Sequence, residues 1–161
     1  MRAPYTQLYV HCVWATWDRL PVLTLEIERP VYAAIVARCH ALKCEALAVG
    51  GMPDHVHLLV RLHPALAVSD LLKEVKGASS HLVTHQVRPG EFFKWQGAYG
   101  AFSVSKDALE RVRAYIERQK AHHQQGDLWP EWAAASDETE IYLAPTLLRS
   151  PDDLPKSEHF V

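Results

Sequence analysis

The chain has 161 residues, of which 48% are hydrophobic, and its formal net charge is −2. This length and composition favour one domain with one buried core and exclude a disordered chain. No apolar run approaches the roughly 20 residues of a membrane helix, and the first residues lack a secretory signal, so we expect a cytoplasmic protein without a membrane partner. The three widely spaced cysteines form no Cys-x-x-Cys pair and are expected to be reduced core residues.

The net charge is an average over two unlike parts of the chain. Residues 1–126 contain 15 Lys or Arg and 11 Asp or Glu, whereas residues 127–161 contain 2 and 8. We therefore divide the chain into a mildly basic domain over residues 1–126 and an acidic, proline-containing tail over residues 127–161. A basic domain is compatible with a partner that carries phosphates.

Hydrophobic patterning predicts six elements in the domain, followed by a third helix. In chain order the expected elements are a strand over Gln7–Thr16, a helix from Ile27 or Pro30 to Leu42, a strand over Glu45–Val49, a strand over His55–Leu62, a helix from Ser69 to about Gln86, a strand over Tyr99–Ser105, and a helix from Asp107 to about Gln125. Pro30 is placed in the first helical turn, and Ser69 and Asp107 are expected as helix caps. The order β-α-β-β-α-β predicts an α+β fold of the ferredoxin-like pattern, an antiparallel sheet with two helices on one face. The third helix is then expected on the open face.

The strand over His55–Leu62 carries a candidate metal site. His55 and His57 lie on one face of it, separated by a core-facing Val56. Two imidazoles at this spacing, about 6.5–7 Å apart at the backbone, can converge on one ion. Histidines on a sheet face are also often merely solvated, so the pair alone leaves both interpretations open. Asp54 is either an orienting partner of an imidazole or only a turn residue.

The third helix supplies two further candidates. Its predicted buried stripe contains Leu109, Val112 and Ile116, and Tyr115 and Gln119 lie one turn apart at the edge of that stripe. A tyrosine at such an edge is more often a core residue than a nucleophile. Taken alone, the position of Tyr115 is therefore compatible with a nucleophile and with a core residue.

Four sequence motifs, in this chain order, distinguish a catalytic site from ordinary structural residues. They are Met52-Pro53-Asp54-His55-Val56-His57-Leu58-Leu59-Val60, Leu72-Lys73-x-x-Lys76-Gly77-x-Ser79-Ser80, Gly100-x-Phe102-Ser103-Val104-Ser105, and Tyr115-Ile116-x-x-Gln119. Together they resemble the single-tyrosine HUH transposases of the 200/605 group of insertion sequences, which include transposases associated with repetitive extragenic palindromes (REP). The resemblance covers about residues 5–125. The tail from Asp127 onward has no counterpart in it.

The resemblance implies an enzyme that cuts and rejoins single-stranded DNA, with DNA hairpins as expected targets. His55, His57 and Gln119 would bind Mg²⁺ or Mn²⁺, and Tyr115 would be the nucleophile that forms a 5′-phosphotyrosine. It also implies a homodimer, in which the tyrosine helix completes the metal site of its own or of the other subunit. No Gly-rich phosphate-binding loop is present, so no nucleotide cofactor is expected.

Further residues are candidates for contacts with DNA. Lys73, Lys76, Ser79 and Ser80 on the second helix are expected to contact backbone phosphates, or else to form an ordinary solvated face. Trp95 is a candidate for stacking on an unpaired base, and a core position is its alternative.

Two other nucleic-acid functions compete with the transposase. One is a nickase of the relaxase or replication-initiator type, which uses related chemistry. The other is a domesticated protein that binds nucleic-acid hairpins without cutting them. A ferredoxin-like metabolite-binding domain is a third alternative, for which the string around His55 would be a coincidence.

Overall fold

The structure is a computed structural model that describes residues 2–119, so the predicted boundary at residue 126 and the tail over residues 127–161 lie outside it. The predicted order β-α-β-β-α-β, followed by a third helix, is confirmed. The helices and strands are β1 Tyr9–Ala15, α1 Leu25–Ala41, β2 Glu45–Met52, β3 His55–Arg61, α2 Val68–Leu82, β4 Gly100–Val104 and α3 Leu109–Glu117.

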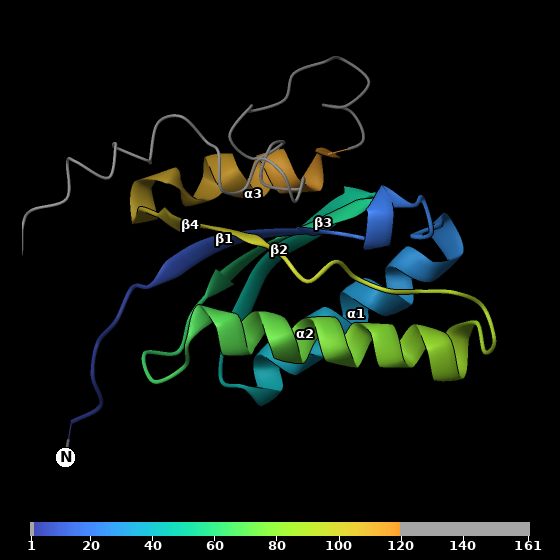
Figure 1. Cartoon of the computed structure of the whole chain (residues 1–161). Coiled ribbons are helices and arrows are strands. Elements are labelled where there is room, and N and C mark those ends of the chain that lie inside the picture. Colours follow the sequence, from blue (N-terminus) through green and yellow to red (C-terminus); the bar gives the residue numbers. More distant parts are fainter. Residues whose placement is uncertain (1, 120–161) are drawn as a thin grey trace, which may run out of the picture.

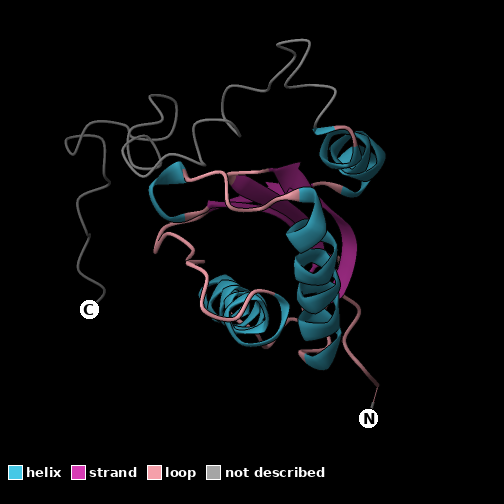
Figure 2. Ribbon diagram, turned by 90° about the vertical axis from the view of Figure 1, so that its right-hand side faces the viewer, coloured by secondary structure: helices cyan, strands magenta, loops and turns pink. Residues whose placement is uncertain are grey.

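The four strands form one sheet in the order β2-β3-β1-β4, and every neighbouring pair is antiparallel. Helices α1 and α2 cover one face of this sheet, and α3 lies on the other face (Figures 1 and 2). The fold is therefore α+β, and the third helix occupies the face that the sequence left open.

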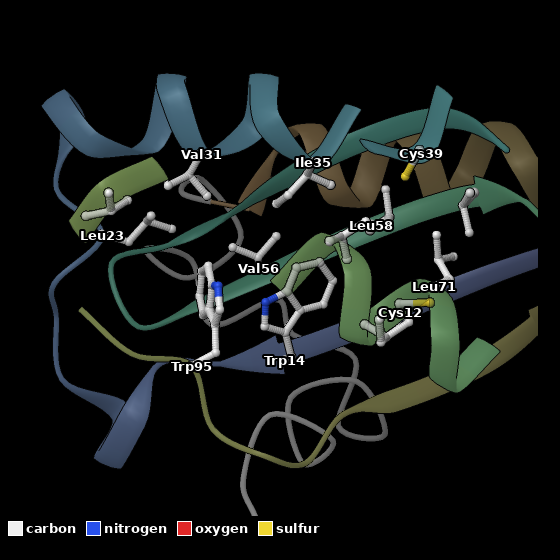
Figure 3. Close-up of a cluster of buried hydrophobic side chains, with 14 of the residues drawn as sticks. Cys12, Trp14, Leu23, Val31, Ile35, Cys39, Val56, Leu58, Leu71 and Trp95 are labelled. Atoms are coloured by element: carbon white, nitrogen blue, oxygen red, sulfur yellow. The ribbon is translucent and has the colours of Figure 1, made fainter. Parts of the chain in front are cut away.

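The larger core lies between the sheet and the pair α1 and α2. Side chains on alternate positions of the central strands point into it, among them Trp14, Val56 and Leu58 (Figure 3). They meet the buried side of α1, which includes Val31, Ile35 and Cys39. This face of the sheet holds the fold together and leaves the opposite face to α3.

A smaller core forms under α3, around Leu59, Val112 and Ile116. Gly50 on β2 permits the close approach of this helix, because a Cβ atom at Gly50 would lie 2.4 Å from the backbone oxygen of Ile116. β2 extends to Met52, beyond its predicted end at Val49, and so includes Gly50. The missing side chain of Gly50 lets the helix backbone rest on the strand.

The helix starts differ from the sequence prediction. Helix α1 begins at Leu25, so Pro30 lies in its second turn and not in its first. Helix α2 begins at Val68 with no side-chain cap, and Ser69 is inside it. A 3-10 turn over Lys106–Ala108 leads into α3, and Asp107 lies within that turn instead of capping the helix. These helices therefore begin where their packing on the sheet requires, and not at the capping residues that the local sequence suggested.

Candidate active site

The two histidines of β3 point to the sheet face that α3 covers. His55 is 3% exposed and His57 is 1% exposed, so neither is a solvated surface residue. Their ring centroids are 5.1 Å apart and the rings are nearly perpendicular. The alternation of β3 produces this arrangement, since Val56 between them points into the larger core.

Asp54 orients the ring of His55. Its Oδ1 atom lies 2.7 Å from Nδ1 of His55, and its Oδ2 atom accepts two N–H bonds from Arg19 at 3.1 and 3.0 Å. Burial raises the pKa of the Asp54 carboxyl, but its bonds and charge interactions with His55 and Arg19 outweigh burial and lower that pKa to about 2. The carboxylate thus accepts from Nδ1 of His55, which leaves the lone pair of the neutral ring at Nε2.

Gln119 faces that lone pair. Its Oε1 atom lies 3.4 Å from Nε2 of His55, and its amide nitrogen donates to the backbone oxygen of Tyr115 at 3.4 Å. The side chain is 2% exposed. An amide oxygen opposite an imidazole lone pair brings two electron-rich atoms together, and a cation or a proton between them stabilises such a pair.

His11 on β1 is the corresponding neighbour of His57. Its Nε2 atom lies 2.9 Å from Nδ1 of His57, and the two rings stack at 5.1 Å. Burial lowers the pKa of His11 to about 3, so this ring is neutral at physiological pH. A neutral His11 accepts at Nε2 when His57 donates from Nδ1, and the lone pair of His57 is then at Nε2, as in His55.

Sequence reasoning left His11 without a role. The register of the sheet pairs Val13 with His57 and His11 with Leu59, which makes His11 a diagonal neighbour of His57 on the same face. Only the pairing of β1 with β3 contains this signal. Arg19 was missed for the same reason, because it is 35 residues from Asp54 in the sequence.

Tyr115 completes the group. It lies on α3, is 3% exposed, and its ring meets the ring of His57 edge to face with centroids 5.8 Å apart. The structure therefore brings together all four residues that the sequence singled out for catalysis and metal binding, and it does so within one chain. Their chemical roles stay predictions.

The expected DNA contacts fit less well. Trp95 is buried among Trp14 and Phe93, and its Nε1 donates to Ser79 Oγ at 3.0 Å. Ser79 is fully buried and its hydroxyl donates to the carbonyl of Val75 at 2.7 Å. Because Trp95 is only 6% exposed and Ser79 is 0% exposed, the structure favours the core position for Trp95 over stacking on a base, and it leaves the Ser79 hydroxyl out of reach of a phosphate.

The other three residues expected to contact DNA differ in exposure and in their hydrogen bonds. Lys76 donates to the carbonyl oxygens of three successive residues, 96–98, and so holds the loop before β4. Lys73 is exposed, and Ser80 is half-buried with its hydroxyl donating to Gly77 at 3.2 Å. Lys73 is thus the side chain of this set most available to a phosphate.

Within residues 2–119, no three His, Cys, Asp or Glu side chains converge as a metal-binding group. The set described above differs, since it contains two histidines and an amide. No helix in the described part of the chain is long and apolar enough to cross a membrane.

Residues 4–119 match the family model described as IS200-like transposase. The chain belongs to the IS200-like transposases. Among its relatives is the ISDra2 transposase TnpA of Deinococcus radiodurans, which is 29% identical over 118 residues, a region that covers 70% of this chain and 84% of the relative. As an IS200-like transposase, the protein is a DNA-cleaving and strand-transferring enzyme of an insertion-sequence family.

Two solved structures resemble this IS200-like transposase. A candidate transposase from Deinococcus radiodurans aligns with a TM-score of 0.55 and 28% identity, over 74% of this chain and 95% of its own. A REP-associated tyrosine transposase bound to a REP hairpin aligns with a TM-score of 0.57 over 81% of this chain and 79% of its own. The latter is 18% identical and therefore supports the fold alone.

Proposed function

We propose that this transposase cleaves single-stranded DNA by attack of the Tyr115 hydroxyl on a phosphodiester. The observation that carries the proposal is the position of the Tyr115 ring, edge-on to His57 on the buried face that also holds His55 and Gln119. A tyrosine that served only the core would not need two oriented imidazoles and an amide oxygen beside it.

A divalent cation, Mg²⁺ or Mn²⁺, fits this donor set. The atoms that would hold it are Nε2 of His55, Nε2 of His57 and Oε1 of Gln119. The 3.4 Å between the first and the last is close to the separation of about 3 Å expected for adjacent ligands of an octahedral Mg²⁺ ion. When bound, the ion neutralises a non-bridging phosphate oxygen and stabilises the leaving oxygen.

The side chains of this protein account for the other steps. Asp54 and His11, each bound to the Nδ1 atom of one imidazole, would fix the tautomers of His55 and His57 with both lone pairs at Nε2. The Tyr115 oxygen forms a bond to phosphorus while the bond to the 3′-oxygen breaks; the phenolic proton passes to water, and the leaving 3′-oxygen takes up one proton from water, so no net acid or base is consumed. The products are a 5′-phosphotyrosine and a free 3′-hydroxyl. Rejoining reverses the exchange on another strand and needs no nucleotide, because the phosphoester bond is conserved.

A DNA hairpin is the proposed substrate. The REP hairpin in the complex of the structural neighbour supports this choice, although it is a property of that protein. On this chain, exposed Lys73 and the hydroxyl of Ser80 line a groove beside α2 that could follow a backbone. The homodimer stays part of the proposal. Tyr115 contacts His57 within one chain, and in a homodimer the same contact can form between the two subunits.

The test is formation of a covalent protein–DNA adduct. The full chain is incubated with Mn²⁺ and labelled single strands from the flanks of its own gene, and an adduct stable in hot SDS is sought. We expect Tyr115→Phe and His57→Ala to lose the adduct. Tyr5→Phe, which alters an exposed tyrosine, and His63→Ala, which alters a histidine outside the site, should keep it.

Two results would contradict the proposal. An adduct that survives Tyr115→Phe would show that another residue is the nucleophile. Hairpin binding without any adduct in the unmodified protein would favour the domesticated binder.

A further inference from the structure

Trp17 differs from the other tryptophans of the described residues. Trp14 is 0% exposed and Trp95 is 6% exposed, whereas Trp17 is 44% exposed. A large aromatic ring left in water forgoes the stabilisation that burial would give it. The position of Trp17 therefore calls for a role other than packing.

The turn that carries Trp17 is rigid. It spans Trp17–Arg19, and Asp18 and Arg19 have φ angles of 54° and 50°, a left-handed conformation that is unfavourable for non-glycine residues. Contacts with neighbouring segments hold it, because Arg19 donates twice to Asp54 and the amide of Trp17 donates to the Lys94 carbonyl at 2.8 Å. The indole is thus presented on a fixed backbone.

A positive charge lies on the same ring. The Nζ atom of Lys94 is 3.6 Å from the centroid of the Trp17 ring. Lys94 and Trp17 are brought together by two segments that run side by side, in which Thr16 bridges to Trp95. An exposed aromatic ring beside a cation is the combination that binds single strands, since a base stacks on the ring and a phosphate pairs with the charge.

The backbone of Trp17 lies close to the candidate active site. Ala15 is the register partner of His55, and the Thr16 amide donates to the Asp54 carbonyl at 2.9 Å. Trp17 follows these residues directly. With strands about 5 Å apart and about 3.3 Å per residue, its backbone is about 10 Å or less from that of His55.

We propose that Trp17 and Lys94 form a binding site for one unpaired nucleobase and its phosphate, next to the phosphodiester that Tyr115 attacks. Lys94 covers one face of the indole, and the base stacks on the other. The site takes any base, because every base offers an aromatic face. This inference rests on the proposed function, and it assigns the flanking part of the strand to a place on the protein.

The test measures binding of a fluorescein-labelled oligothymidylate by anisotropy, in a Tyr115→Phe background so that no strand is cut. We expect Trp17→Ala to weaken binding about 5- to 150-fold, the effect of losing one stacked base. Trp17→Phe should recover most of the affinity, because it keeps an aromatic face. The matched control is Tyr5→Ala, which removes an exposed aromatic ring at the other end of the sheet and should leave affinity unchanged.

Binding to an abasic strand of deoxyribose phosphates distinguishes a loss of base stacking from a general loss of protein structure. Trp17→Ala should not change the affinity for this strand, whereas Lys94→Met should weaken binding to both strands. Equal weakening of both strands by Trp17→Ala, or no weakening of either, would overturn the inference alone. Absence of any binding to the thymidylate by the Tyr115→Phe protein would overturn the proposed function as well.

Discussion

Replacement of Gly50 by alanine tests whether the backbone of α3 rests on β2. The new Cβ atom would stand 2.4 Å from the backbone oxygen of Ile116, whereas ordinary contacts begin at 3.4 Å. The helix must therefore withdraw by about 1 Å, the difference between these distances. Since the obstacle is backbone, no side-chain rotation relieves the clash.

The expected loss of stability is about 1–3 kcal/mol, the usual cost of overpacking. For a chain of this length it corresponds to a melting temperature about 2–12 °C lower. Because Tyr115 precedes Ile116, the same displacement should slow adduct formation by about 100-fold, as misplacement of a reacting group by 1 Å commonly does.

Gly77→Ala is the matched control. Gly77 lies inside α2, and a Cβ atom there meets nothing within 4 Å. Alanine should stabilise this helix by about 1 kcal/mol and leave adduct formation unchanged. Thermal unfolding by circular dichroism and the SDS-stable adduct provide the two measurements. If Gly50→Ala unfolds and reacts like the unmodified protein, α3 does not rest on Gly50 in solution and the position described for Tyr115 is wrong.

Three further outcomes are expected. His11→Phe removes the acceptor for His57 and should weaken Mn²⁺ binding, measured calorimetrically, about 10- to 100-fold; unchanged binding would remove His11 from the site. Lys76→Met should lower the melting temperature, because three backbone carbonyls lose their hydrogen-bond donor. Lys73→Met should leave the melting temperature unchanged, but it should reduce the slope of log binding constant against log salt concentration by about 0.7. The reverse pattern would contradict these assignments. Burial raises the pKa of Cys12 to about 12, so mass spectrometry should find this thiol unalkylated by iodoacetamide at neutral pH until the protein unfolds, and rapid alkylation of folded protein would refute its burial.

Local periodicity was sufficient for much of the architecture. The alternation in the segment that became β3 placed His55 and His57 on one face, and the 3.6-residue period of α3 placed Tyr115 one turn before Gln119. Both predictions depend on neighbours in the sequence, whose relative directions the backbone fixes. The fold class followed from the order of such elements.

Other features depend on which distant segments meet. The contacts of His11 with His57 and of Arg19 with Asp54 exist only because β1 pairs with β3 in one register. Trp95 lies in the core and Trp17 at the surface, although composition alone makes a tryptophan equally suited to either place. Sequence therefore determined the elements and the reactive side chains, whereas tertiary packing decided which side chains orient the site and which face the solvent, because burial and long-range hydrogen bonds are properties of the assembled sheet.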